Sequence, residues 1–432
     1  MKMKNFELFV QLLLIFFISQ VNCKKQYNTD INLKFEFNYI IDKINETIFF
    51  ENVKYLKNDD DILIFRNFPR RRKEDINNYT FTKYDEKNKT FSAWPDDQND
   101  YNRNNSDCSR FVSIIDFEFD EEKNIYLLDD GNLTCPITLY IFNLKGVLQD
   151  KYTIFEKNIH FLLLSNFVID KINNYTYIPF YLSYDNNDTL SSAGFFIINI
   201  KDKNTTKVYL NNSKFLYDEK YNFNFKNDLF KNNLGKIKNK IINVALTCDG
   251  EYLLFCPLSS RMIYSVLTKK LRDESTKSIL INDVKEAYKN DASSSLIYSN
   301  MGNLYFTGLE NYSIYIANQI ENDLALFDFN NFEKRDNETM GYPTKLSITD
   351  GILYITSKKI EKEKTNFRIY NQIFSTLIDK DKSYIYKCEG LAYKWKWTAY
   401  AAWLILLVII VFVWVFVSIG NEQDKKIIKK NN

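Results

Sequence analysis

Residues 243–268 alternate short apolar runs with turn signals, and this pattern predicts three consecutive β-strands. The first run reaches Leu246, and Asp249-Gly250 then supplies the two positive-φ residues of a tight hairpin turn. A second run extends from Tyr252 to Phe255, and Pro257 ends it because proline cannot donate to a strand ladder. A polar corner and a third apolar run follow. This order is typical of one propeller blade, although a meander in a β-sandwich has the same local pattern.

Repetition of the same turn signal along the chain favours the propeller. Further turns are expected at Asp59-Asp60-Asp61, Asn124, Asn173-Asn174, Gly302 and Gly351. Most neighbouring turns lie about 50 residues apart, within the range of propeller-blade repeats. The larger gap before Gly250 contains a loop rich in Asn and Lys, from Asn204 to Lys240. We therefore expect an all-β fold with six blades.

Four segments also resemble the yellow/major royal jelly protein family, in the order in which that family has them. Residues 256–268 are similar to its HPLSSRRLYRVPT segment, and the other matching segments are 111–131, 135–145 and 302–310. The resemblance extends over about Val53 to Leu377 and implies a six-bladed propeller. Asp130 departs from the family pattern, which usually has Thr there.

Composition allows a large folded domain. The chain has 432 residues and 45% apolar content, so it can bury a substantial core and needs no cofactor to fold. Its net charge of +2 gives no indication of nucleic acid binding. Lys2 and Lys4 precede the apolar run Leu8–Ile18, and small residues precede Cys23. This predicts a secretory signal peptide over residues 1–23, with an N-terminal anchor as the alternative.

Asn-x-Ser/Thr sites are consistent with a secreted glycoprotein. Eleven occur after the signal peptide: Asn45, Asn78, Asn88, Asn104, Asn132, Asn174, Asn187, Asn204, Asn211, Asn311 and Asn337. The number is only modestly above the chance expectation for a chain so rich in Asn.

Two cysteines are placed to form a disulfide. Cys108 and Cys135 open the first and third strands of one predicted blade, and in an up-down-up meander both starts lie at the same end of the sheet. Cys248 and Cys256 lie at opposite ends of one hairpin and should not pair with each other. Either could be a buried thiol or pair with Cys388, because sequence does not fix connectivity.

The C-terminal region predicts a membrane anchor. Ala399–Ile419 is a run of 21 mostly apolar residues without charge, flanked by interfacial tryptophans and followed by a Lys-rich tail. We expect an ectodomain over residues 24–394, a transmembrane helix over 395–420 and a cytosolic tail over 421–432. A buried core helix and a lipid-anchor signal are the alternatives.

The predicted topology is a single-pass type I membrane protein with a lumenal or extracellular ectodomain. Lys429-Lys430 resembles a dilysine signal for retrieval to the endoplasmic reticulum, although chance explains it equally well in this tail.

Motifs for chemistry are few. The chain has a single histidine, His160, in an apolar context that indicates a core or blade-edge position. Residues 70–73 form a basic run that we interpret as a solvated loop, with a cleavage site or anion patch as the alternative. Asp116, Glu118 and Asp120 alternate along one strand, which predicts that one face meets solvent. The candidate ligand-binding residues at loop ends are Asp129, Asp130, Ser259, Ser260, Arg261, Thr307 and Glu310. For Asp129-Asp130-Gly131, a turn-forming role is the alternative that we favour.

One metal hypothesis concerns Asn243. Residues 243–250 are similar to a segment of the gluconolactonase-like calcium propellers in which the matching Asn is a metal ligand. Only Asn243 matches, and the Glu and Asp partners that Ca²⁺ requires are not placed. A structural role for Asn243 is the alternative that we favour.

Two classes of function stay open. A binding or structural ectodomain would present a central pocket to a small amine, a sterol or a protein partner, and the family resemblance implies such binders. The alternative is an enzyme, either a tautomerase acting on catechol-derived quinones or a calcium-dependent lactonase. Tautomerisation would require Asp129, Asp130 or Glu310 to act as acid or base with a pKa raised by burial. No motif demands catalysis, so we favour binding. Convergent buried carboxylates in a pocket would reverse that preference.

Overall fold

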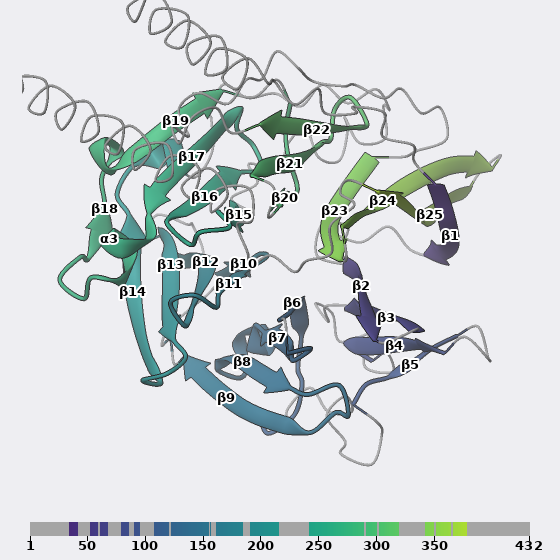
Figure 1. Ribbon diagram of the computed structural model, residues 1–432, viewed down its shortest axis with the longest axis horizontal. Coiled ribbons are helices and arrows are strands. Elements are labelled where there is room, and N and C mark those ends of the chain that lie inside the picture. Colours follow the sequence, from purple (N-terminus) through teal and green to yellow (C-terminus); the bar gives the residue numbers. More distant parts are fainter. Residues whose placement is uncertain are drawn as a thin grey trace, which may run out of the picture. The chain divides into compact units, whose positions relative to one another are not determined.

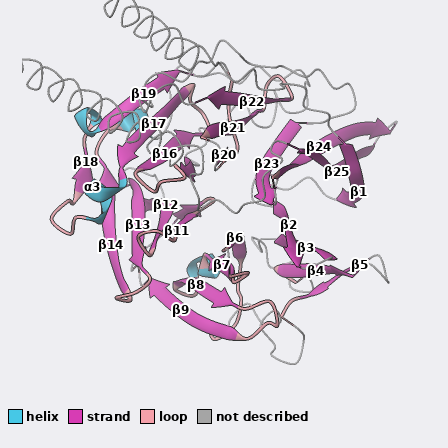
Figure 2. Cartoon of the chain, in the orientation of Figure 1, coloured by secondary structure: helices cyan, strands magenta, loops and turns pink. Residues whose placement is uncertain are grey.

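In the computed structural model, strands dominate the described part of the chain (Figure 2). The structure describes residues 34–41, 52–58, 61–67, 79–85, 90–95, 108–120, 122–154, 156, 161–184, 191–215, 242–288, 291–299, 302–318, 342–349, 351–363 and 366–377. The signal peptide, the transmembrane helix and the tail that the sequence predicts lie outside these residues, as do His160, Cys388 and residues 70–73. No helix within the described ranges is long and apolar enough to cross a membrane.

The strands, which are labelled in Figure 1, form six sheets. The sheets are numbered here in their order along the chain. The first contains β2 (Asn52–Asn58), β3 (Asp61–Asn67), β4 (Phe81–Asp85) and β5 (Thr90–Ala93). The second contains β6 (Ile114–Phe119), β7 (Ile125–Asp129), β8 (Ile137–Phe142) and β9 (Leu148–Ile154). The third contains β10 (Phe161–Leu164), β11 (Val168–Asp170), β12 (Tyr175–Ser183), β13 (Ser191–Asn199), β14 (Asn204–Leu210) and β18 (Ser278–Ile279).

The remaining three sheets follow the same up-and-down order. The fourth contains β15 (Ile242–Leu246), β16 (Tyr252–Pro257), β17 (Met262–Leu267) and β19 (Val284–Tyr288). The fifth contains β20 (Leu296–Tyr298), β21 (Asn303–Gly308) and β22 (Ser313–Asn318). The sixth contains β23 (Tyr342–Thr349), β24 (Ile352–Glu363), β25 (Asn366–Leu377) and β1 (Lys34–Ile41). Short helical turns are α3 (Thr268–Arg272), η4 (Gly131–Leu133), η5 (Ser213–Phe215) and η6 (Ile281–Asp283).

The fold is an all-β propeller, as predicted, but the blade count needs a correction. Five sheets have the four or more strands of a complete blade, whereas the fifth sheet has only three strands in the described part of the chain. The structure thus has five complete blades, not six. Tight turns mark the inner hairpin of a blade, but an outer strand carries no comparable signal, so counting turns does not establish that each blade is complete.

The predicted turns that lie in described residues connect neighbouring strands where the sequence places them. The prediction of two positive-φ residues at Asp249-Gly250 is wrong for Asp249, and Asp59 and Asp60 lie outside the described residues. Gly250, Gly302 and Gly351 have φ values of 70°, 82° and 73°, and Asn174 has a φ of 61°. This left-handed region is accessible to glycine and tolerated by asparagine, which explains these residue types at the hairpins.

The N-terminal strand completes the last sheet. β1 pairs antiparallel with β25, from Lys34 opposite Ser375 to Ile41 opposite Ile369. Strands more than 300 residues apart in sequence are thereby joined in one sheet, so the two ends of the described chain stabilise the same blade.

Aromatic side chains fill the space between neighbouring sheets. Phe65 and Phe81 of the first sheet pack with Phe117 of the second in one buried cluster, and the Phe81 and Phe117 ring centroids lie 4.9 Å apart. In another cluster, Phe195 of the third sheet packs edge-on against Phe255 of the fourth at 5.5 Å. Such rings supply large apolar area, and their edge-to-face pairs add further stabilisation.

Polar side chains on or beside the inner strands link the first sheet to the second and the second sheet to the third. The Asn67 amide donates to Ile115 O at 2.7 Å, from the first sheet to the second. Phe167 N donates to Asp116 Oδ2 at 3.2 Å, between the third and second sheets. Each bond joins a side chain of one sheet to the backbone of its neighbour, which fixes how the two sheets are placed along each other. We call these bonds the inner-strand ties.

The ties continue through the later sheets. Asn166 donates to Val244 O at 2.8 Å and accepts from Val244 N at 3.2 Å, linking the third and fourth sheets. Asn243 donates to Ser293 O at 3.0 Å, and Ser294 Oγ donates to Thr344 O at 2.8 Å. Five successive pairs of sheets are therefore joined in the same way.

We expect Asn166→Ala to destabilise the fold by about 2–3 kcal/mol, because it leaves two buried backbone groups of Val244 without partners. Urea unfolding of the purified chain measures this. The exposed control Gln149→Ala should change the unfolding free energy by less than about 0.5 kcal/mol. Equal effects of the two substitutions would contradict a structural role for the tie.

Candidate functional site

The inner strands enclose a small cavity. Its walls come from all six sheets: Lys54, Asp116, Glu118, Phe119, Asn166, Val168, Ile169, Val244, Ala245, Leu246, Ser295, Leu296, Ile297, Tyr298, Lys345 and Leu346. The volume is about 50 Å³. A single water requires about 10–15 Å³, and pockets for drug-sized ligands measure about 300–1,000 Å³. The cavity therefore has room for a few waters or for the charged end of a small molecule, and it is too small for a sterol.

Lys54 is the centre of the charge cluster in this cavity. It comes from β2, is only 4% exposed, and lies 3.7 Å from the Asp116 carboxylate. Its ammonium group also donates to a Glu118 oxygen and to the backbone oxygen of Phe117. The Phe117 ring centroid lies 5.2 Å from Lys54 Nζ. A buried cation requires such partners, since desolvating it alone would cost several kcal/mol.

Asp116 and Glu118 reach the cavity together because they are two residues apart on β6 and project from the same face. Asp116 is fully buried, whereas the Glu118 side chain is 25% exposed. Burial raises the pKa of Glu118, and the positive charge of Lys54 opposes that rise. The prediction that this acidic run presents a face to solvent is wrong for Asp116 and Asp120, which are both buried. β6 is the inner strand of a blade, so its residues pack against neighbouring sheets as well as its own.

Lys345 is the fourth charged group of the cavity and differs from Lys54. It comes from β23 and is 5% exposed. Its side-chain ammonium group makes no hydrogen bond, and no ion pair within 4.0 Å, with any of the described residues. Burial lowers the pKa of Lys345, the nearby charge of Lys54 lowers it further, and Asp116 opposes both. The cavity thus contains two lysines. Lys54 is paired with carboxylates, whereas the Lys345 amine has no close partner.

The predicted loop-end candidates do not line this cavity. Asp129 ends β7, and its carboxylate accepts backbone N–H groups of Val112 at 2.7 Å, Ser113 at 2.9 Å and Gly131 at 2.9 Å. Asp130 accepts from Asn132 N at 2.9 Å. Burial raises the pKa of Asp129 to about 6, with the adjacent charge of Asp130 as the second cause. The raised pKa expected for an acid or base is present, but the oxygens of Asp129 already bind the turn.

Thr307 has the same role in the fifth sheet. Its hydroxyl accepts from Ser294 N at 2.9 Å and from Ser295 N at 3.1 Å, in the segment that leads into β20. Glu310 follows β21, is 5% exposed, and donates its backbone N–H to Asp291 at 2.9 Å. Burial raises the pKa of Asp291 to about 6, and the Glu310 charge contributes to the rise.

The polar corner of the fourth sheet is also a turn. Ser259, Ser260 and Arg261 connect β16 to β17, and Ser260 Oγ accepts from Met262 N at 3.0 Å. Both serines are buried and Arg261 is half-buried. Like Asp129 and Glu310, this corner lies at the end of its sheet where the inner strand begins. The seven candidates are therefore brought to equivalent ends of three sheets and not to one site.

Asn243 is 1% exposed, and its amide serves the tie to Ser293 described above. Within the residues that the structure describes, no group of three or more His, Cys, Asp or Glu side chains could hold a metal ion. The calcium hypothesis for Asn243 stays a prediction.

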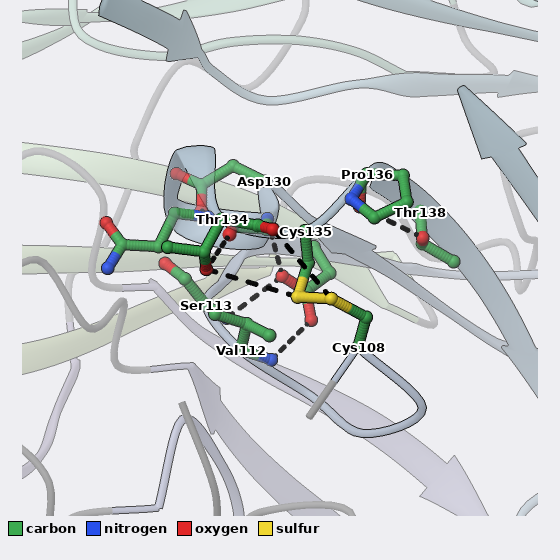
Figure 3. The surroundings of a disulfide bond; sticks show 11 residues. Cys108, Val112, Ser113, Asp130, Thr134, Cys135, Pro136 and Thr138 are labelled. Atoms are coloured by element: carbon green, nitrogen blue, oxygen red, sulfur yellow. Dashed lines mark hydrogen bonds between the residues drawn. A yellow bond between two sulfur atoms is a disulfide. The ribbon is translucent and has the colours of Figure 1, made fainter. Parts of the chain in front are cut away.

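The predicted disulfide is confirmed. Cys108 and Cys135 are bonded, with Cα atoms 5.3 Å apart, beside the turn that Asp129 and Asp130 hold (Figure 3). Cys248 also takes part in a disulfide, whereas Cys256 is a buried thiol. The expectation that Cys248 and Cys256 do not pair with each other is therefore correct.

Five of the predicted glycosylation sites lie in described segments. Asn174, Asn204 and Asn211 are exposed, and Asn132 and Asn311 are half-buried. The Asn311 amide donates to Asp291 at 2.9 Å, so this residue is already engaged. The other six sites, Asn45, Asn78, Asn88, Asn104, Asn187 and Asn337, lie outside the described residues. Glycosylation stays a prediction at all eleven.

The sheets and the cavity between their inner strands define a propeller with a small central site. The family model for the major royal jelly proteins matches residues 112–382, more than half of the chain. The chain belongs to the major royal jelly protein family. No curated protein sequence matches the chain significantly.

Several solved structures show a distant similarity to this chain. The luciferin-regenerating enzyme is 11% identical with a TM-score of 0.42, and the alignment covers 75% of this chain and 91% of that one. The periplasmic gluconolactonase of Pseudomonas aeruginosa is 8% identical with a TM-score of 0.41, covering 68% and 78%. The alpha-L-arabinanase of Penicillium chrysogenum is 11% identical with a TM-score of 0.45, covering 81% and 99%. At these values the similarities carry no argument about activity.

Titration of Asp129 should make stability depend on pH. In the folded state Asp129 stays protonated up to about pH 6, because its pKa is raised from the ordinary value of 3.8. Between these two pH values the folded state therefore binds more protons than the unfolded state. The contribution of Asp129 to the unfolding free energy therefore falls as pH rises from about 4 to 6, by about 3 kcal/mol. Asp129→Asn should remove this part of the slope, measured by urea unfolding from pH 4 to 7.

The exposed control Asp202→Asn should keep the wild-type slope. Asp129→Asn is also expected to be less stable at every pH, because an amide nitrogen replaces an acceptor of backbone N–H groups. An unchanged slope in Asp129→Asn would show that this carboxyl does not titrate as stated.

The Cys108–Cys135 disulfide closes a loop with a sequence separation of 27. By loop-closure entropy, Cys108→Ser with Cys135→Ser should lower the unfolding free energy by about 3 kcal/mol. Thermal or urea unfolding under non-reducing conditions measures the loss. Dithiothreitol should destabilise the wild type more than this double variant, and an equal effect on both proteins would contradict the assignment.

Proposed function

We propose that this chain is a binding protein whose central cavity takes the ammonium group of a small amine. The observation that carries the proposal is the position of Glu118, a carboxylate that lines the cavity and keeps 25% of its side chain exposed. Phe119 and Tyr298 also line the cavity, and aromatic faces attract cations. An incoming ammonium group would find a carboxylate and aromatic side chains in one partly desolvated place.

The size of the cavity limits the ligand. A volume of about 50 Å³ accommodates the charged end of an amine but not a sterol. Among the sequence-based alternatives, the amine is therefore favoured over the sterol. A protein partner would have to bind outside this cavity.

An enzyme of the tautomerase class is the second candidate. Asp116 and Glu118 are the convergent carboxylates that would favour catalysis, and burial moves the pKa of Glu118 upward while it moves that of Lys345 downward. Such opposite shifts bring an acid and a base closer to neutral pH, as proton transfer requires. Lys54, however, contacts both carboxylates, so they form an ion-pair cluster and not an open acid–base pair. This is why binding is preferred.

The remaining predictions from sequence complete the proposal. The chain would be a glycosylated single-pass type I membrane protein, with the propeller in the lumen or outside the cell and retrieval to the endoplasmic reticulum as an option. No nucleic acid, no required cofactor and an optional Ca²⁺ ion belong to the same set of expectations.

A thermal-shift assay with phenylethylamine, tyramine and ethanolamine tests the proposal. A ligand at 100 times its dissociation constant should stabilise the folded state by about 2.7 kcal/mol, and the melting temperature should rise accordingly. Glu118→Gln should abolish the rise, because the neutral amide gives no charge to the ammonium group. The matched control Glu310→Gln lies outside the cavity and should keep it.

A shift lost in Glu310→Gln but kept in Glu118→Gln would place the ligand at the loop ends and overturn the proposal. Turnover of dopachrome that is lost in Glu118→Gln would favour the tautomerase.

A further inference from the structure

The second lysine of the cavity has no use in amine binding. Lys345 is 5% exposed on β23 and lines the cavity, yet none of the described residues accepts a hydrogen bond from it or pairs with it within 4.0 Å. Lys54, nearly as buried at 4%, has Asp116, Glu118 and Phe117 O as partners. Burying an ammonium group without partners costs free energy, which shifts such a side chain toward its neutral form relative to an exposed lysine.

Burial is the largest effect on the pKa of Lys345 and lowers it, while the charges of Asp116 and Glu118 oppose that fall. The titratable residues that face the cavity are Lys54 from β2, Asp116 and Glu118 from β6, and Tyr298 from β20. Lys54 contacts both carboxylates, whereas neither forms an ion pair with the Lys345 ammonium group within 4.0 Å. Burial and the charge of Lys54 lower the pKa of Lys345. A desolvated lysine beside another cation is a recognised way to activate an amine nucleophile.

We propose that Lys345 is a covalent capture site for small aldehydes, which it binds as an imine inside the cavity. The amine adds to the carbonyl carbon to give a carbinolamine, and loss of one water forms the carbon–nitrogen double bond. No oxidant or reductant is needed. Glu118, whose pKa burial raises, lies in the same cavity and can supply the proton that leaves with this water. The volume of about 50 Å³ restricts the aldehyde to a few heavy atoms.

This inference goes beyond amine binding: Lys345 is the reacting group, and Glu118 serves only as a proton donor. If amines gave no thermal shift, the proposed reaction of Lys345 with aldehydes would still stand. If no imine formed, the proposed binding of amines at Glu118 would still stand. The two can therefore be told apart.

Reductive trapping tests the proposal on the full chain. The protein is incubated at pH 6.5 with a low concentration of acetaldehyde and cyanoborohydride, whose hydride reduces the imine to a stable ethyl-lysine. Peptide mass spectrometry then locates the ethyl groups. The expected result is one ethyl group per chain at early times, on the peptide that contains Lys345.

Internal and variant controls sharpen the result. Lys203 has a 64% exposed side chain, and Lys54 is buried but ion-paired, so both should stay unmodified at that stage. Lys345→Met should lose the early ethyl group, and Lys345→Arg should lose it while retaining the positive charge. A wild-type melting temperature in either variant shows that the loss is not due to unfolding. Benzaldehyde, which is too large for the cavity, should not compete with acetaldehyde for Lys345.

Ethyl groups spread over exposed lysines, with Lys345 modified no earlier than Lys203, would overturn the proposal. Early modification of Lys345 that benzaldehyde blocks would also overturn it, because the reaction would then take place outside the enclosed cavity.

Discussion

Hydrogen bonds between side chains of one inner strand and the backbone of the next sheet are the constraint on which this structure depends. Aromatic side chains pack between the sheets, but apolar contacts alone tolerate sliding of one sheet along another. The ties made by Asn67, Asn166 and Asn243 remove that freedom, because each leaves buried polar groups unpaired if the sheets shift. Lys54 extends the same principle with charge, since it reaches from the first sheet to Phe117 and Glu118 of the second.

The same bonds shape the cavity. Asn166 lines it while holding Val244, and Asp116 lines it while accepting from Phe167 N. The polar groups at the centre of the propeller therefore belong to the framework, and a ligand must use what they leave available. Glu118 and Lys345 are the charged groups that remain, one partly exposed and the other without a close partner. That division of roles underlies both the amine proposal and the imine proposal.

Sequence reasoning found the hairpins because a positive φ restricts residue type, as at Gly250 and Gly302. It also found the disulfide, because strand order alone places Cys108 and Cys135 at one end of a sheet. It could not find the cavity. Nothing in the sequence distinguishes Lys54 and Lys345 from the many other lysines of the chain. Only the arrangement of the sheets brings the two into one cavity. The loop-end candidates Asp129 and Thr307 were noticed for their polarity, but that polarity serves backbone N–H groups. Polar residues after a strand are common at turns, so the pattern does not separate a cap from a site.

A crystal structure of the chain grown with phenylethylamine would test the central claim most directly. The account predicts the ammonium nitrogen within hydrogen-bonding distance of a Glu118 carboxylate oxygen, with Phe119 and Tyr298 beside the ligand. Density for the amine at the loop ends near Asp129 or Glu310, with only water between Glu118 and Lys345, would contradict it.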